Sequence, residues 1–480
     1  MYRQYYQMTL DDYNFPYGKL DPENEWVKLA ELVPWDTAEA AYARQFVNNG
    51  HPAHPVRIAL GALIIKQKLQ CSDEWVVRHV SENPYLQFFL GMKAYTNKCP
   101  FGASTMVEFR KRFPPETIAA LLKASTPKEK DNDKRNPPGD GGSRSDDQAN
   151  TCENSGTLLM DATCCPADVA FPQDFQLLND AREHMEHMID EICEANRLKR
   201  PRMRRRCARR DFLSLSKSKK RSAKKIRAGV RKQLQYIFRD IGFVTNMIQK
   251  MGVQLTKTQS NLLNTITTLY EQQRFMFENH THSVENRIVS LAQPWIRPIV
   301  RGNTHANTEF GAKLHISMVN GYAKIERLSF DAFNEATDFF SAVEGYRQDH
   351  GFYPARILAD KIYRSREILA WCKERRIQMT GPALGRPPKN PDRRREVRRQ
   401  EYQDICDRNI VEGEFGVGKR SYGLNRIMAH LPETSFCVIG IALLCMNLQK
   451  RLRALLSALF QIFFEIMTQM GGKKFRMVAE

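Results

Sequence analysis

The spacing of hydrophobic residues divides the chain into regions of different expected structure. Apolar positions within residues 1–125 recur at helical spacing, most densely over 56–70, and Ser72 provides a cap for a further helix over 73–81. Residues 126–156 have no apolar periodicity and are rich in Lys, Asp, Asn, Pro, Gly and Ser, which predicts a flexible linker. We therefore expect an N-terminal all-α domain that a linker separates from the rest of the chain.

The last of the expected N-terminal helices is basic. It begins near Ser104 and carries Arg110, Lys111 and Arg112 between two phenylalanines. Several short helices that end in a basic one can form a helix-turn-helix that reads DNA, and these three cations are then candidate DNA contacts. A helical bundle used for dimerisation fits the same pattern.

Beyond the linker, the pattern predicts an α/β domain over 157–460 and a C-terminal tail over 461–480. Short apolar or alternating runs predict strands at 158–163, 312–319, 322–330, 355–359 and 377–380. Asn-Gly joins the second and third of these strands and is the strongest short signal for a hairpin. Helical patterns follow at 335–348, 365–376 and 407–420, and a basic loop is expected at 385–399.

A long helical stretch, residues 175–298, interrupts this domain after its first strand. Within it, residues 197–232 contain eighteen Lys and Arg against one acid, Asp211, so that this segment alone carries +17. Such a density repels itself unless a polyanion is bound, and we expect it to hold a phosphate backbone through residues that include Arg204, Arg205 and Arg206. A solvated charged surface is the alternative.

Without that helical stretch, the expected order is three strands, a helix, a strand, a helix, a strand and a helix. This is the element order of an RNase H-like fold, in which strands connected through helices extend a sheet built on a hairpin. The predicted fold class is therefore α/β: an RNase H-like mixed sheet with flanking helices, a long helical insertion and an N-terminal all-α domain.

The last helix of that order has two distinct faces. At about 100° per residue, Arg408, Glu412, Gly416 and Lys419 share one side of 407–420. The opposite side is expected to be an apolar stripe that docks on the core, formed by Ile410, Val417 and Leu424.

Charge and cysteine content indicate which class of partner and which cellular compartment suit the chain. A formal charge of +19 indicates a polyanionic partner, and the longest apolar run, 436–448, is short for a bilayer span, so we expect a buried helix and no membrane partner. Eleven cysteines without a CxxC pair support neither a disulfide framework nor a zinc ribbon, and the N-terminus lacks a secretory signal. A reducing cytoplasm fits these features, and the nearby His184 and His187 are expected to be ordinary helix surface.

Three acids suggest a site for a hard cation. Asp161 and Asp360 stand at the ends of expected strands, and Glu412 lies on the last helix. Converging carboxylates suit Mg²⁺, which Mn²⁺ can replace, and two such ions support phosphoryl transfer at a phosphodiester. Asp331, near the end of the hairpin, is the rival to Asp161.

The same residues resemble a known family. Arg408, Glu412 and Lys419 match the R(3)E(6)K spacing in the signature of DDE transposases of the IS-five and IS-four-like bacterial insertion sequences. Further segments are similar to a subgroup with an N-terminal helical domain: 161–163, 166–168, 297–302, 360–366, 381–387 and 422–424, together with 54–69 and 109–113. The resemblance covers most of the chain. It departs from the signature at Ile405, where a tyrosine is usual, and in the position of the helical insertion, which many DDE enzymes carry after the second acid.

The resemblance implies a transposase that binds the terminal inverted repeats of an insertion sequence and catalyses Mg²⁺-dependent strand cleavage and strand transfer. Asp161, Asp360 and Glu412 would be the catalytic, metal-binding residues, and Arg408 and Lys419 would contact the transposon end. We expect double-stranded DNA and a second copy of the chain as partners, and a cytoplasmic, nucleoid-associated location. A catalytically inactive DNA-binding relic or repressor, and an RNase H-like nuclease, are the alternatives.

Overall fold

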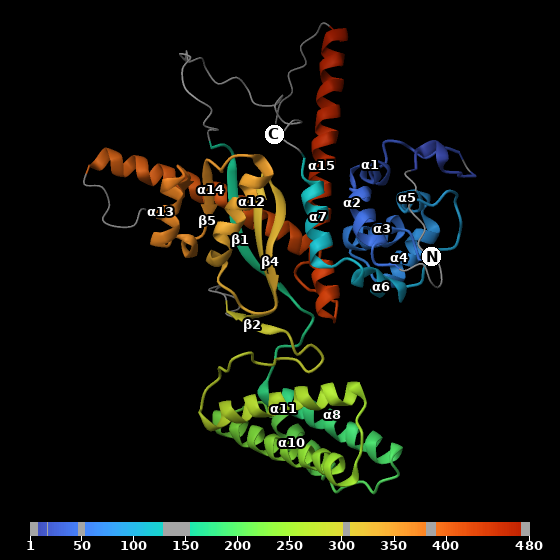
Figure 1. The fold of residues 1–480 in the computed structure, drawn as a ribbon, viewed down its shortest axis with the longest axis vertical. Helices are drawn as coiled ribbons and strands as arrows, with labels where there is room; N and C mark the ends of the chain where they lie inside the picture. Colours follow the sequence, from blue (N-terminus) through green and yellow to red (C-terminus); the bar gives the residue numbers. More distant parts are fainter. Residues whose placement is uncertain are drawn as a thin grey trace. The chain divides into compact units, whose positions relative to one another are not determined.

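The computed structural model of the chain describes residues 8–16, 18–46, 53–127, 154–300, 308–380 and 390–471. The chain divides into two compact units, and its fold is mixed α/β, as the sequence predicts (Figure 1). The first unit comprises residues 1–165, 314–328 and 333–480, and the second comprises 166–313 and 329–332. The linker expected at 126–156 lies mostly outside the described residues.

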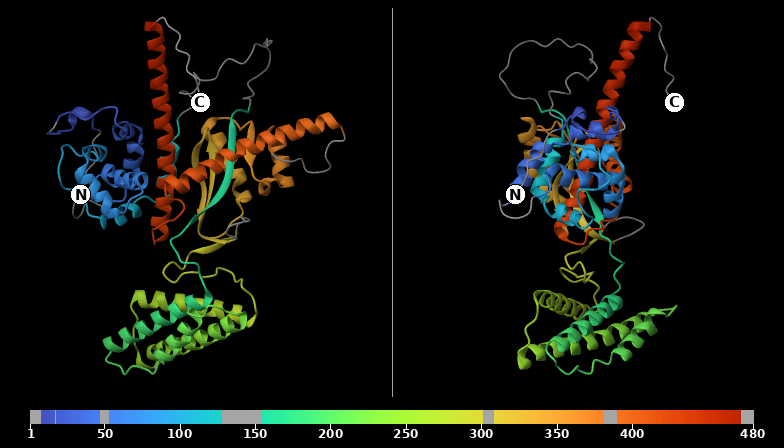
Figure 2. Two further views of the ribbon diagram at one scale, coloured as in Figure 1. Left: turned by 180° about the vertical axis from the view of Figure 1, so that it is seen from behind. Right: turned by 90° about the vertical axis from the view of Figure 1, so that its right-hand side faces the viewer.

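In the first unit, the N-terminal helices pack around a long helix close to the other end of the chain, α15 (Pro432–Gly471) (Figures 1 and 2). Gly440 of α15 allows this contact, since a Cβ atom there would lie 2.3 Å from Cγ2 of Ile118. The expected boundary at 460–461 falls inside α15. The N-terminal elements are η1 (Leu10–Asp12), α1 (Glu25–Leu32), α2 (Trp35–Ala43), α3 (Val56–Leu69), α4 (Asp73–Glu82), α5 (Pro84–Phe89), α6 (Thr105–Lys111) and α7 (Pro115–Ser125).

The apolar run 436–448 forms the buried part of α15, as predicted. Ile441, Ala442, Leu443 and Leu444 are each at most 1% exposed. The segment Pro432–Ala458 is long and apolar enough to cross a membrane, and 72% of its most apolar window is buried inside the protein. A core helix of a soluble protein meets the same criteria, so this helix is weak evidence for a membrane span.

Six strands form one mixed sheet in the order β2-β3-β1-β5-β6, with β4 paired to β3. The strands are β1 (Thr157–Pro166), β2 (Arg297–Val300), β3 (Thr308–Val319), β4 (Tyr322–Ser329), β5 (Arg356–Ala359) and β6 (Gln378–Met379). Asn320 and Gly321 connect β3 to β4 with φ angles of 51° and 75°. Both positive values are those of a type I′ turn, and the predicted hairpin is confirmed.

Helices on both faces of the sheet hold its central strands in place. On one face, Leu158 and Met160 of β1 share a core with residues of α12 (Phe339–His350) and α13 (Arg366–Glu374), next to η3 (Glu335–Asp338) and η4 (Lys361–Tyr363). On the opposite face lies α14 (Pro391–Ser421), as the front and rear views show (Figures 1 and 2). The Arg356 guanidinium of β5 pairs with both Asp404 and Asp407 of α14, at 2.7 Å in the second pair. These ion pairs fix α14 against the strand.

Two expectations about α14 are wrong. Residues 391–399 are helical rather than a loop, because Asn390 caps the helix by accepting from the backbone N–H of Asp392 (2.9 Å) and Pro391 suits a first turn. The predicted apolar stripe is wrong at Ile410, which is 55% exposed, whereas Val411 and Phe415 are buried at 1% and 8% exposure. Leu424 of that stripe is buried as predicted, at 0% exposure. The pairing of Arg356 sets the rotation of the helix, and this rotation places Ile410 toward solvent.

The second unit is a bundle of four helices, which correspond to the predicted helical insertion. The apolar faces of these helices share one core. After the last helix, β2 pairs antiparallel with the first residues of β3. The helices are α8 (Asp174–Ala195), α9 (Arg205–Ser216), α10 (Ala223–Met251) and α11 (Lys257–Glu278).

Candidate active site

The sheet places Asp161 and Asp360 side by side. Strands β1 and β5 are parallel, with Leu159 opposite Leu358 and Met160 opposite Ala359. Asp161 and Asp360 are the next residues beyond the last paired positions, and the charge of Asp360 acts on the Asp161 carboxyl. The Asp161 carboxylate accepts from the backbone N–H of Ala162 (2.8 Å), and Asp360 caps η4 by accepting from the N–H of Lys361 (2.7 Å). Two of the predicted acids are therefore neighbours.

Helix α14 adds the third acid through an arginine. Arg408 lies one residue beyond Asp407, which pairs with β5, and its Nη1 donates to Oδ1 of Asp360 at 3.0 Å. Its Nη2 lies 3.8 Å from Oε1 of Glu412, one turn further along the helix. The guanidinium thus bridges the Asp360 and Glu412 carboxylates, and Arg408 and Glu412 lie on one face of α14, as predicted.

The environment of Asp161 disfavours its charged form. Burial raises the pKa of its carboxyl to about 6, and the charges of Asp360 and Glu335 act in the same direction. The hydrogen bond from Ala162 and the positive charge of Arg408 lower this pKa in part. A cation bound next to this carboxyl would stabilise its ionised form and lower its pKa.

A buried polar network that the sequence pattern does not predict lies beside these acids. His315 of β3 is completely buried, and its Nε2 lies 2.9 Å from the Tyr363 hydroxyl while its Nδ1 lies 3.3 Å from Oδ2 of Asp338. Burial lowers the pKa of the His315 imidazole and raises that of the Tyr363 hydroxyl. Tyr363 follows Asp360 in η4, so the network holds the turn that carries this acid. A histidine between Leu314 and Ile316 in an apolar strand was the available signal.

The three acids offer the ligand chemistry of Mg²⁺, since all are carboxylates and Mg²⁺ prefers oxygen ligands. Their spacing does not form a closed site. Among the described residues, no three His, Cys, Asp or Glu side chains are grouped closely enough to hold a metal ion. The Arg408 guanidinium offsets one of the two negative charges of Asp360 and Glu412 in this arrangement.

Two segments of the chain match known protein families. Residues 357–449 match the family model described as "Transposase DDE domain", and residues 16–112 match "Transposase domain (DUF772)". The resemblance to DDE transposases is confirmed. The DDE transposase match contains Asp360, Arg408, Glu412 and Lys419, whereas Asp161 lies outside it.

A curated relative matches over a shorter stretch. The chain is 38% identical over 106 residues to a protein of Rhizobium meliloti named "Uncharacterized protein ORF8 in nfe locus". The alignment covers 22% of this chain and 51% of that protein, so the chain spans about half the length of the relative. No solved structure matches the chain.

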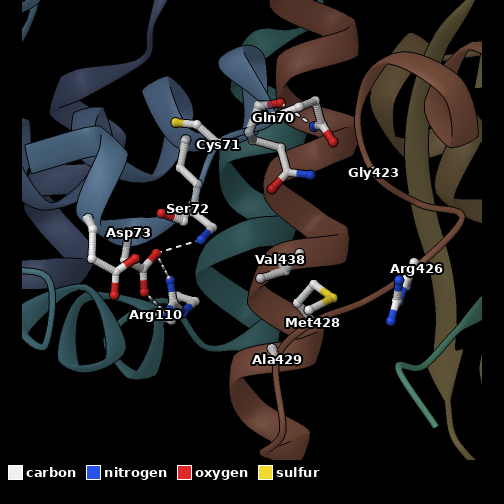
Figure 3. Close-up of a pocket in the computed structure, with 13 residues that line it drawn as sticks. Gln70, Cys71, Ser72, Asp73, Arg110, Gly423, Arg426, Met428, Ala429 and Val438 are labelled. Carbon is white, nitrogen blue, oxygen red and sulfur yellow. Dashed lines mark hydrogen bonds and ion pairs between the residues drawn. The ribbon is translucent and has the colours of Figure 1, made fainter. Parts of the chain in front are cut away.

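A pocket of about 470 Å³ lies between parts of the two transposase matches (Figure 3). Asp73 and Arg110 line one side, where two nitrogens of the Arg110 guanidinium donate to the Asp73 carboxylate at 3.1 and 2.6 Å. Arg426 and Met428 come from the other side. Of the three candidate DNA contacts at 110–112, Arg110 is thus bound within the protein at 9% exposure.

The other two cations at the end of α6 have different surroundings. Lys111 is exposed and pairs with Glu108 at 3.0 Å, and the Arg112 guanidinium lies 4.2 Å from the centre of the Phe46 ring. Lys419 on α14 is half-buried and forms no ion pair with any residue that the structure describes. Lys111 and Lys419 therefore retain access to solvent.

The candidates in the helical bundle also differ from one another. Arg204 and Arg206 are exposed, whereas Arg205 pairs with Asp190 of α8 at 2.6 Å. His184 and His187 are exposed on the surface of α8, as predicted, and their rings lie close to Asp180 and Glu191 of the same helix. Asp331 is 73% exposed and pairs with Arg297 at 3.6 Å.

Proposed function

We propose that this chain is a DNA transposase that binds the terminal inverted repeats of an insertion sequence and catalyses Mg²⁺-dependent strand cleavage and strand transfer. The observation that carries the proposal is the bridging position of Arg408, which links Asp360 at the end of β5 to Glu412 on α14, beside Asp161 in the register of β1. The two transposase matches support the same function.

The sheet supports an RNase H-like fold for this site. Starting from β4, the strands run β4-β3-β1-β5-β6, so a hairpin supplies one side of the sheet. Parallel strands β5 and β6 extend the other side from β1 through connecting helices. In such open sheets, functional groups gather beyond the carboxyl ends of parallel strands, where Asp360 is found.

Asp161, Asp360 and Glu412 would hold Mg²⁺ or Mn²⁺, and the bound ions would supply the charge that stabilises the attacking and leaving oxygens at a phosphodiester. Asp161 has to be ionised for this task. Arg408, released from Asp360 and Glu412, would contact the phosphate backbone of the transposon end, and Lys419 would do so from the same helix. A guanidinium suits this contact because it can donate two parallel hydrogen bonds to a phosphate.

Double-stranded DNA and a second copy of the chain are the partners of this proposal, with a cytoplasmic, nucleoid-associated location. An inactive DNA-binding relic or repressor would not need the acids to be retained. An RNase H-like nuclease that acts in repair or on RNA would not need to recognise element ends. A DNA-reading N-terminal region would serve such recognition and therefore favours a transposase.

Cleavage of defined DNA tests the proposal. The substrate is a duplex that carries the inverted repeats flanking the gene, compared with random duplex and with an RNA–DNA hybrid. We expect Asp161→Asn, Asp360→Asn and Glu412→Gln each to abolish Mg²⁺-dependent cleavage and to bind the ends with unchanged affinity, whereas the exposed Glu396→Gln on the same helix retains activity. Cleavage of the hybrid alone, or no metal-dependent cleavage by the unaltered protein, would contradict a transposase.

A further inference from the structure

The cations of residues 197–232 have two different structural roles. Some connect the helices of the second unit: Arg200 and Arg205 pair with Asp190 of α8 at 3.3 and 2.6 Å, and Lys232 of α10 pairs with Asp211 of α9 at 3.2 Å. These side chains stabilise the bundle. They are therefore poor candidates for contacts to another molecule.

A second group lies together on the outside of α9. Arg206, Arg209, Arg210 and Lys217 line an open hollow of about 490 Å³. All four are exposed, and none of them forms an ion pair within the described part of the chain. We call these four residues the α9 cationic face.

The amino-acid spacing explains why the four cations share a face. At about 100° per residue, they fall within roughly 100° of one another on the helix surface, and Ala208 and Leu215 point to the opposite side. Both apolar residues are buried in the structure, at 0% and 8% exposure. Asp211 is turned toward α10, where it accepts from the Tyr236 hydroxyl at 2.9 Å. The one acid of the segment is thus directed away from the cationic face.

Four like charges on one face are unfavourable without a counter-charge. Arg206 and Arg210 are one turn apart, and a like-charge pair at this spacing is destabilising. From Arg206 to Lys217, the helix rises about 16 Å, and each DNA strand carries a phosphate about every 3.4 Å along the duplex axis. The face is therefore long enough to meet several phosphates in succession.

We propose that the α9 cationic face binds the phosphate backbone of double-stranded DNA without reading its sequence. This inference rests on the proposed transposase function and adds to it a DNA contact outside the catalytic unit. A membrane surface is the weaker fit, because a helix that binds a bilayer inserts an apolar face and the apolar side of α9 is buried in the bundle.

The salt dependence of DNA binding tests this surface. The full-length Arg209→Gln/Arg210→Gln variant is compared with Lys250→Gln/Lys257→Gln, which removes the same charge from exposed positions of the same unit. Affinity for a random duplex is measured by fluorescence anisotropy between low and moderate salt. We expect the slope of log K against log salt to fall by about 2 for the first variant, because each lost phosphate contact removes roughly 0.9. The control should keep the slope of the unaltered protein.

The inference would be overturned if both variants kept the slope of the unaltered protein. It would also be overturned if the slope fell by the same amount in both variants. A parallel measurement uses vesicles of anionic phospholipid, and loss of vesicle binding with unchanged DNA binding would assign the face to a membrane surface and overturn the inference. Cleavage of element ends separates the two proposals. If the unaltered protein cleaves the ends but the two variants behave alike, the α9 surface is wrong and the transposase function stands.

Discussion

The Arg408 guanidinium donates from Nη1 to Oδ1 of Asp360 at 3.0 Å, in an ion pair between the helix and the strand end that carry two of the three candidate metal ligands. A cation of the protein therefore offsets part of the negative charge of the Asp360 and Glu412 carboxylates. The pair is partly exposed, since Arg408 and Asp360 keep 30% and 53% of their side-chain surface. Such a pair contributes roughly 0.2–1 kcal/mol, so a divalent ion can displace it.

Arg408→Gln should strengthen metal binding in the absence of DNA. Removal of the guanidinium leaves Asp360 and Glu412 without their counter-charge, and we expect Mn²⁺ to bind about two- to fivefold more tightly, in line with a pair worth up to about 1 kcal/mol. Electron paramagnetic resonance of free Mn²⁺ during a titration measures the affinity. Lys419→Gln removes the same charge from the same helix and should leave the affinity unchanged; an equal gain in both variants would show a general effect of net charge.

The Tyr363 hydroxyl should contribute to the stability of the first unit. Tyr363→Phe leaves Nε2 of His315 without its partner at 2.9 Å in a fully buried position, which costs about 1–2 kcal/mol. Urea unfolding measures the change in free energy. Tyr353→Phe is the matched control, because its hydroxyl bonds to Glu344 at 2.8 Å in a half-buried position where water can replace it. An equal loss in the two variants would contradict a special role for the buried pair.

Arg110 and Lys111 are adjacent in the sequence, and the structure gives them opposite expected effects. Arg110→Gln should lower the free energy of unfolding by about 2 kcal/mol, because it breaks a bidentate pair with the Asp73 carboxylate, which keeps Lys66 as its second partner at 2.5 Å. Lys111→Gln should change it by less than about 0.5 kcal/mol, since its partner Glu108 is exposed. Thermal unfolding followed by circular dichroism compares the two. An unchanged free energy of unfolding in Arg110→Gln would contradict a stabilising role for the Arg110–Asp73 pair.

The pattern along the sequence predicted most elements, because their periodicity is a local property. The Asn320–Gly321 hairpin, the long bundle helices α8, α10 and α11, and the buried run in α15 all follow from residues close in sequence. The spacing of Arg408 and Glu412 likewise predicted one shared helix face. Which face of that helix turns toward the sheet depends on Arg356, which is about 50 residues away. Local spacing therefore predicts burial of Ile410, whereas the structure buries Val411.

The charged candidates show the same limit. A run of cations does not reveal which members have partners, because these partners lie on other helices. Arg205 resembles Arg206 in sequence, but Asp190 of α8 binds only the first. Asp73 likewise binds Arg110, 37 residues away, and not the adjacent Lys111. The network of His315, Tyr363 and Asp338 joins three elements and could not be assembled from spacing alone.

The buried Asp240 of α10 should make the stability of the helical bundle depend on pH. Burial raises the pKa of its carboxyl to about 6, well above the ordinary value of 3.8, although Arg239 donates to it at 2.7 Å. Between about pH 4 and pH 6 the folded protein holds a proton that the unfolded chain has lost, so the free energy of unfolding falls as pH rises through this window. A shift of this size corresponds to at most about 3 kcal/mol.

Asp240→Asn removes the ionisation and should abolish this fall. Urea unfolding at pH 4.5 and pH 7, followed by far-ultraviolet circular dichroism, compares the variant with the unaltered protein. Asp190→Asn is the control with the opposite sign: the pair with Arg205 lowers the pKa of Asp190, so its stabilisation is present above the ordinary pKa and is lost only at lower pH. The control should therefore shift stability by the same amount at both pH values. An unchanged pH dependence in Asp240→Asn would mean that this carboxyl is already ionised at pH 4.5, with Arg239 outweighing the cost of burial.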